Sequence, residues 1–186
     1  MKKQGGSWFV YGPLPFCINI TFMHIRSVLR SDAKAIADIY NYYVLQTTVS
    51  FENSAVDEND MAARIVNISS LYPYFICEDE NGKVVGYCYA HMWKERVAYS
   101  HTWETTIYVS PEYRGKGVGA LLMNRLIAAC RDAGCHVLIA CITAENDSSI
   151  RFHKQLGFHK VSHFNQVGNK FGRWLDVEDY ELMLHL

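Results

Sequence analysis

The sequence predicts a single α/β domain with a mixed order of strands and helices. Two apolar runs flank Asn81-Gly82, a strong turn signal, and predict an antiparallel hairpin. Further along, residues 101–109 and 135–142 have the pattern of strands, and residues 118–133 between them have the pattern of a helix. Hairpins followed by strand–helix–strand units are typical of an α/β fold. The 186 residues suit one domain with a sizeable core.

The N-terminal elements are predicted to be a strand and two helices. Residues 24–30 have the pattern of a strand. The first helix is expected over 31–44, with Ser31 as its N-cap, and the second over 58–70. The apolar positions of the first helix are three and four residues apart, namely Ile36, Ile39 and Tyr40.

The later elements follow a glycine-rich loop. The helix after this loop carries an apolar stripe, and Gly134 is its expected C-terminal stop. Residues 135–142 are almost continuously apolar, as in a buried strand. A short helix is predicted to end at Gly157, and strands are predicted over 159–164 and 180–186. The stripe consists of Val118, Leu122, Leu126 and Ala129.

Composition argues against several classes of partner. The formal net charge is -1, and no cluster of lysines and arginines marks a surface for nucleic acid or a membrane. The six cysteines contain no Cys-x-x-Cys pair, and with the eight histidines they show no ligand spacing, so no metal site is expected. Buried free thiols in a reducing cytosol fit this cysteine usage, which predicts a cytoplasmic protein.

The first residues differ from the rest of the chain. Residues 1–22 contain two lysines and an apolar stretch that Gly12 and Pro13 interrupt. A short signal peptide would share these lysines and apolar residues. The interruptions instead favour an N-terminal extension outside the core, from an upstream start codon, with the domain over 23–186. No stretch is long enough to span a membrane.

Three glycines, Gly115, Gly117 and Gly119, lead directly into a predicted helix. The free N–H groups at the start of a helix attract anions, and glycines let a phosphate approach the backbone. A P-loop requires Ser or Thr after Gly-Lys, but here Lys116 is followed by glycine. The dinucleotide fingerprint is matched literally, with Ala120 as its last position, but residues 110–113 separate the loop from the preceding strand and the next strand ends without an acidic residue.

The segment from Arg114 to Gly119 reads R-x-x-G-x-G and resembles the acetyl-CoA pyrophosphate loop of the GCN5-related N-acetyltransferases. Downstream, "AENDSSIRFHKQLGF" is similar to that family's second cofactor segment, in which an asparagine recurs, here Asn146. The resemblance implies a mixed sheet that is split by a bulge, flanked by helices and open to the cofactor. His153 stands where many members carry an acidic tyrosine. It could be an acid, a contact to CoA or a helix-face residue.

A closer resemblance covers residues 24–184. The segments 49–53, 93–119 and 167–177 are similar to phosphinothricin N-acetyltransferases and to methionine sulfoximine or sulfone acetyltransferases. This implies an acetyl-CoA-dependent, homodimeric enzyme without a metal that acetylates the α-amine of small amino-acid analogues by direct transfer. Two alternatives are acetylation of another amine (antibiotic, polyamine or protein N-terminus) and a non-catalytic acyl-CoA sensor.

The resemblance identifies Glu104 as the base that takes the proton of the amine, although by its spacing alone it fits an ordinary strand carboxylate. A cationic loop suits an anionic acceptor but is also typical of a solvated surface. The expected acceptor-binding residues are Phe51, Lys94, Arg96, Tyr99, Glu104, Thr105 and Thr106. The expected cofactor-binding residues are Ile107, Tyr108, Val109, Arg114, Gly115, Lys116, Gly117, Val118, Gly119, Ala120 and Asn146. Residues that could close the pocket, within one chain or across a dimer, are Lys170, Phe171 and Arg173.

Overall fold

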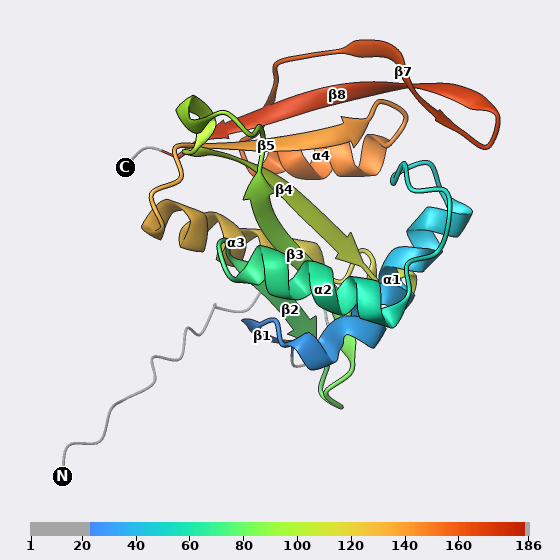
Figure 1. Cartoon of the computed structure of the whole chain (residues 1–186), viewed down its shortest axis with the longest axis vertical. Coiled ribbons are helices and arrows are strands. Elements are labelled where there is room, and N and C mark those ends of the chain that lie inside the picture. Colours follow the sequence, from blue (N-terminus) through green and yellow to red (C-terminus); the bar gives the residue numbers. More distant parts are fainter. Residues whose placement is uncertain (1–22, 185–186) are drawn as a thin grey trace, which may run out of the picture.

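The computed structural model of the chain describes residues 23–184. In this part of the chain eight strands form one mixed sheet in the order β1-β2-β3-β4-β5-β8-β6, with β7 paired to β8 (Figure 1). The extension predicted over 1–22 lies outside the described residues. The strands are β1 His24–Ser27, β2 Tyr74–Glu78, β3 Val84–Met92, β4 Thr102–Val109, β5 Val137–Thr143, β6 His159–Lys160, β7 Phe164–Lys170 and β8 Arg173–Met183. The helices are α1 Ala33–Gln46, α2 Glu58–Ser69, α3 Val118–Asp132 and α4 Asp147–Gln155.

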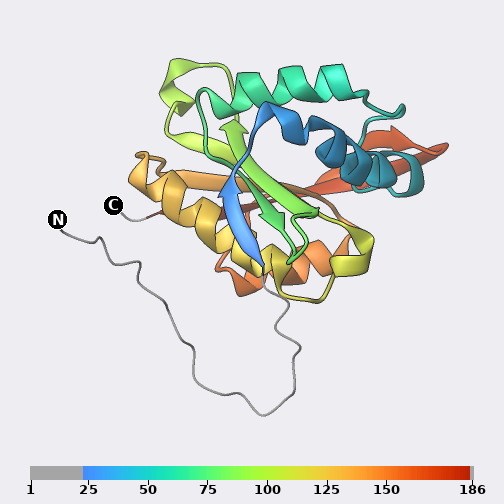
Figure 2. The ribbon, with the colours of Figure 1, turned by 90° about the horizontal axis from the view of Figure 1, so that it is seen from below.

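Helices cover both faces of the sheet (Figure 2). On one face, α1 and α2 bury Ile36 and Ile65 against β2 and β3. On the other face, α3 buries Leu122 and Leu126, and α4 packs beside it. This burial of apolar surface on both sides is the main stabilising term of such a fold. The predicted α/β architecture with a mixed sheet is confirmed. No helix within residues 23–184 is long and apolar enough to cross a membrane.

The sheet opens between β4 and β5. These two strands run parallel and pair at only three positions, the last of which joins Glu104 to Ile139. β4 then continues to Val109 in unbroken register with β3, while β5 continues to Thr143, and the two strands diverge (Figure 1). The sheet is therefore split at the expected place, but by this divergence and not by a bulge in β4, because the register of β4 with β3 has no shift. Beyond Glu104 the backbone groups of β4 have no partner strand on the β5 side among the described strands, so they face the opening.

Two glycines predicted as turn and stop residues have the expected conformation. Gly82 has a φ of 76° in the turn between β2 and β3, and Gly134 has a φ of 83° just after α3. These left-handed values favour glycine because it has no Cβ. The hairpin and the helix are therefore confirmed.

The entry into α1 differs from the prediction. Ser31 is not the N-cap, because a 3₁₀ turn over Arg30–Asp32 precedes the helix. The Asp32 carboxylate accepts a hydrogen bond from the N–H of Leu29 and pairs with Arg26 at 2.8 Å. This contact with Arg26 on β1 fixes a tighter turn than the sequence pattern of the helix indicates.

The C-terminal hairpin is the largest correction. The strand expected over 159–164 is only two residues long, β7 was not predicted, and β8 begins at Arg173 rather than at 180. Phe171 and Gly172 form the turn between β7 and β8, with φ values of 52° and 72°. Such a turn usually carries Asn-Gly. Phenylalanine rarely adopts the left-handed conformation, so the Phe171-Gly172 pair does not predict a hairpin.

Candidate active site

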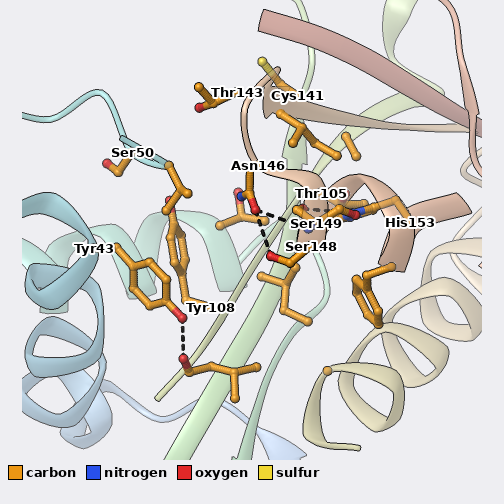
Figure 3. Close-up of a pocket in the computed structure, with 18 of the residues that line it drawn as sticks. Tyr43, Ser50, Thr105, Tyr108, Cys141, Thr143, Asn146, Ser148, Ser149 and His153 are labelled. Carbon is orange, nitrogen blue, oxygen red and sulfur yellow. Dashed lines mark hydrogen bonds between the residues drawn. The ribbon is translucent and has the colours of Figure 1, made fainter. Parts of the chain in front are cut away.

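The opening between β4 and β5 contains a cavity of about 720 Å³ (Figure 3). Its walls come from β4 and β5, from the end of α1 and the segment that follows it, from the glycine-rich loop and from α4. A cavity of this size at a gap in a sheet suits a small molecule. Most of the site residues predicted from the sequence line it, and they divide between its two ends.

The glycine-rich loop forms one end of the cavity. Gly115 and Gly117 have φ values of 73° and 83°, and both line the cavity. Gly117 is the residue before α3 and provides no side-chain cap, so the first N–H groups of this helix are free to bind an anion. A Cβ built on either glycine meets nothing within 4 Å, which leaves open space against the backbone. These residues fit a phosphate group.

Two residues support this loop. The Nε of Arg114 donates to the Tyr43 hydroxyl at 3.2 Å, and its guanidinium lies 5.0 Å from the ring of Tyr43. The Tyr43 hydroxyl in turn donates to the carbonyl of Val109 at the end of β4 (Figure 3). Arg114 therefore adds positive charge to the anion site in a fixed place. Tyr43 was not predicted, although it continues the apolar stripe of α1 by one more turn.

The remaining residues of the loop differ in whether they line the cavity. Gly119 and Ala120 line the cavity, and a Cβ on Gly119 would make an ordinary van der Waals contact with the ring of Phe152, 3.4 Å away. Val118 is buried in the core, and Lys116 lies over the ring of Tyr113. Neither of these two side chains lines the cavity within the described residues.

The free edge of β4 forms the floor of the cavity. Five consecutive residues of this strand line it after Glu104, and Thr105 is held by a hydrogen bond to the Ile139 carbonyl at 3.3 Å. The unpaired N–H groups of this edge can bind polar groups of an extended ligand. The five residues are Thr105, Thr106, Ile107, Tyr108 and Val109.

Glu104 lies where β4 and β5 separate and also lines the cavity. Burial raises the pKa of its carboxyl, and the nearby Asp179 raises it further, while His91 opposes the shift. The Nε2 of His91 is 3.8 Å from the Glu104 carboxylate. A carboxylate whose pKa is raised binds a proton more readily, which suits a general base.

Cys141 is a residue of the cavity that the sequence pattern did not reveal. It was expected to be buried like Cys77, Cys88, Cys130 and Cys135, but it is exposed on β5 and lines the cavity (Figure 3). Solvent reaches the side chain through the cavity, but the surrounding protein still desolvates its sulfur, and this desolvation together with the nearby Glu104 raises its pKa to about 12. The thiol therefore stays protonated near neutral pH and is a poor nucleophile.

Asn146 and His153 belong to α4. Asn146 caps the helix by accepting the N–H of Ser149 at 3.2 Å, and both residues line the cavity. His153 also lines it but is only 3% exposed, and its Nδ1 lies 2.9 Å from the Ser149 carbonyl. Burial lowers the pKa of His153, so the ring is neutral. It is not an exposed helix-face residue.

The acceptor residues predicted from the sequence are only partly brought together. Phe51 lines the cavity along with Glu104, Thr105 and Thr106. Lys94, Arg96 and Tyr99 do not line it within the described chain. Lys94 instead lies 3.8 Å from the ring of Trp93 and 5.4 Å from that of Tyr99. Arg96 is exposed.

Comparisons with known proteins agree with this geometry. Residues 36–158 match the Acetyltransferase (GNAT) family. An L-amino acid N-acyltransferase from Escherichia coli is 40% identical, with 87% of this chain and 94% of the relative covered. An L-methionine sulfoximine/L-methionine sulfone acetyltransferase from Salmonella typhimurium is 40% identical, with 87% and 95% covered.

A solved structure extends the comparison. A GNAT-superfamily phosphinothricin acetyltransferase from Sinorhizobium meliloti, in complex with acetyl-CoA, superposes with a TM-score of 0.84 at 37% identity. The match covers 87% of this chain and 88% of that one. Both the family resemblance and the acetyltransferase class expected from the sequence are thereby confirmed. The chain belongs to the GNAT family of acetyltransferases.

Proposed function

We propose that the protein transfers the acetyl group of acetyl-CoA to the α-amine of small amino-acid analogues of the phosphinothricin and methionine sulfoximine or sulfone type. The observation that carries this proposal is the cavity itself. It joins an anion site at the start of α3 to a partly buried carboxylate at Glu104 across the free edge of β4. The names of the relatives point to the same acceptors.

The proposed cofactor site lies at the start of α3. The free N–H groups after Gly117, together with Arg114, would hold the pyrophosphate of CoA. The edge of β4 from Thr105 to Val109 would bind the extended arm. When bound, acetyl-CoA supplies the activated acetyl group. Among residues 23–184 no group of histidines, cysteines or carboxylates could hold a metal ion, and this chemistry needs none.

Glu104 is the proposed base. An α-amine is largely protonated near neutral pH and must lose a proton before it can attack a thioester. A carboxylate with a raised pKa accepts that proton more readily than an exposed one, directly or through a water molecule. The protonated thiol of Cys141 favours direct transfer over an acyl-enzyme, because a thiol is a far weaker nucleophile than a thiolate.

A screen of acceptors with acetyl-CoA and a thiol-detecting reagent tests the proposal. Phosphinothricin and methionine sulfoximine are expected to be the best acceptors, ordinary L-amino acids poorer ones, and polyamines inactive. The analogues carry a tetrahedral polar group that can be held at the end opposite the carboxylate, which orients the amine. Spermidine outcompeting methionine sulfoximine would contradict this ranking but not the family. If L-amino acids ranked first, the acceptor class named by the Escherichia coli relative would be preferred.

The proposed assembly is a cytoplasmic homodimer. The β7–β8 hairpin exposes several large apolar side chains, and Val97 in the loop before β4 is 87% exposed. Exposed apolar side chains on the hairpin suit contact with a second copy. The proposal includes a dimer in which the Lys94–Tyr99 loop of one copy reaches the cavity of the other. The free thiols of the described chain suit a reducing compartment. The exposed hairpin residues are Phe164, Val167, Phe171 and Trp174.

Arg96→Ala tests the role of that loop. The change is expected to raise the KM for methionine sulfoximine about 10-fold, because it removes one charged hydrogen bond to the acceptor. The Kd for acetyl-CoA should not change. Arg30→Ala, at an exposed arginine that does not line the cavity, is the control. A monomer in sedimentation experiments together with an unchanged KM would contradict both the dimer and this role.

A further inference from the structure

The segment between α1 and α2 crosses the cavity, and we call its residues 47–52 the strap. Its first half is tied to the far side of the opening by two hydrogen bonds. The Thr143 hydroxyl donates to the Thr48 carbonyl at 2.9 Å, and the Thr48 hydroxyl donates to Glu145 at 2.6 Å. Ser50 and Thr143 lie at the same end of the cavity in Figure 3. The strap residues that line the cavity are Thr47, Val49, Ser50 and Phe51.

The second half of the strap is tied to the helices. The Glu52 carboxylate accepts hydrogen bonds from the Tyr40 hydroxyl at 3.0 Å and from Arg64 at 2.6 Å. The Ser50 hydroxyl lies 2.9 Å from that of Tyr40. Phe51 stands between these anchors, 40% exposed toward the cavity. Its position therefore depends on how the backbone at Ser50 is held.

Lys170 holds this backbone from the other side. It lies on β7, is only 1% exposed, and its ammonium donates a hydrogen bond to the Ser50 carbonyl. Burial lowers the pKa of Lys170, and the nearby Glu52 opposes that shift. A buried ammonium is costly to desolvate. An apolar side chain of similar length would fill the space without that cost, but it could not bond the carbonyl of the strap.

The same face of β7 also seats the ring of Phe51. Gly168 and Lys170 are two residues apart on the strand, so they face the same side of it. A Cβ at Gly168 would lie 2.5 Å from the Phe51 ring, which shows that the ring rests directly on this backbone. β7 thus contacts the strap twice, through a hydrogen bond at Ser50 and through packing at Phe51.

We infer that Lys170 is a positioning residue for the acceptor: it fixes the strap through the Ser50 carbonyl and thereby keeps Phe51 on Gly168 as a wall of the acceptor site. Lys170 itself is buried and does not line the cavity, so it acts through Phe51. The inference rests on the proposed function, because it concerns selection of the amine acceptor. The anion site at the glycine-rich loop is not involved.

Lys170→Met tests the inference. The change is expected to raise the KM for methionine sulfoximine about 10-fold, because acceptor binding must then order the strap at a cost of about one charged hydrogen bond, and to leave the Kd for acetyl-CoA unchanged. Lys34→Met is the matched control, because Lys34 is an exposed lysine of α1 whose pairing with Asp38 is also exposed. A general loss of folding would instead lower acetyl-CoA binding as well.

Gly168→Ala disturbs the packing of the Phe51 ring on β7 but leaves the ammonium of Lys170 in place. Its φ is not in the left-handed region, so alanine is allowed there and only the Phe51 ring must move. The same rise in acceptor KM is expected. In a background that already carries Phe51→Ala, both Lys170→Met and Gly168→Ala should have little further effect, because residues that act through one another are not additive.

The results of these experiments distinguish the proposed function from the positioning role of Lys170. Wild-type turnover of methionine sulfoximine with an unchanged KM in Lys170→Met and Gly168→Ala would overturn the inference alone. Additive effects in the Phe51→Ala background would also overturn it, since Lys170 would then act by another route. If the wild-type protein bound acetyl-CoA but turned over no amino-acid acceptor, the proposed function would fail and the inference with it.

Discussion

Replacing Glu104 with glutamine is expected to lower kcat by about 10²–10⁴-fold, the usual contribution of a positioned base. Glutamine keeps the shape of the side chain but cannot accept the proton of the amine. The Kd for acetyl-CoA should change little, because the anion site lies at the other end of the cavity. The measurement is thiol release at saturating acceptor, together with calorimetry of acetyl-CoA binding.

The pH dependence makes this test specific. Burial raises the pKa of Glu104, so the carboxylate becomes protonated at a higher pH than an ordinary glutamate, and activity should fall as the pH drops through that value. In the Gln variant the part of this fall that comes from protonation of Glu104 should disappear. The activity of the variant should then rise only at alkaline pH, as the amine deprotonates in solution. Near-normal turnover at neutral pH would show that another group is the base.

Glu104→Gln is expected to lower the activity of the protein but to raise its stability at high pH. A carboxyl whose folded-state pKa is raised contributes stability that is present below its unfolded pKa and is lost as the pH rises through the folded pKa. At about pH 8 the wild-type protein therefore bears the cost of a partly desolvated charge that glutamine avoids. The Gln variant should melt at a higher temperature there, and the difference should shrink near pH 4. Higher stability with lower activity would exclude unfolding as the cause of the lost turnover.

The parts of the fold that could be predicted from the sequence are those fixed by local chemistry. The turn at Asn81-Gly82 and the glycine stop at Gly134 need only the left-handed conformation that glycine favours. The β7–β8 hairpin could not be found in this way, because Phe171 takes a similar φ with a side chain that normally avoids it. The start of α1 was missed because Asp32 is fixed by Arg26, a contact between different elements.

The candidate site also contains residues that short sequence patterns predict and residues that only the three-dimensional structure reveals. The glycine-rich loop and Glu104 were identified from short motifs and the family resemblance, and both line one cavity. Cys141 was missed because its strand is almost continuously apolar, and only the divergence of β5 from β4 exposes it. No local sequence pattern predicts that Lys170 is buried, because its burial depends on the Ser50 carbonyl, 120 residues away in the chain.

Gly117→Val is expected to weaken acetyl-CoA binding by about 10–100-fold, the result of losing one charge-assisted hydrogen bond. Gly117 has a φ of 83°, and a β-branched residue can adopt this value only with strain. Relief of that strain would turn the first N–H groups of α3 away from the anion. A side chain would also project into the open space beside the loop. The measurement is calorimetric titration with acetyl-CoA.

Gly134→Val is the matched control, because Gly134 lies at the other end of α3 with the same φ of 83° and the same open surroundings. Both changes impose similar backbone strain and should lower the melting temperature by similar amounts. Only the change at Gly117 lies at the cavity, so only it should raise the Kd for acetyl-CoA. If both variants bound acetyl-CoA like the wild-type protein, the start of α3 would not be the anion site. If both lost affinity equally, the loss would come from strain in the helix rather than from the loop.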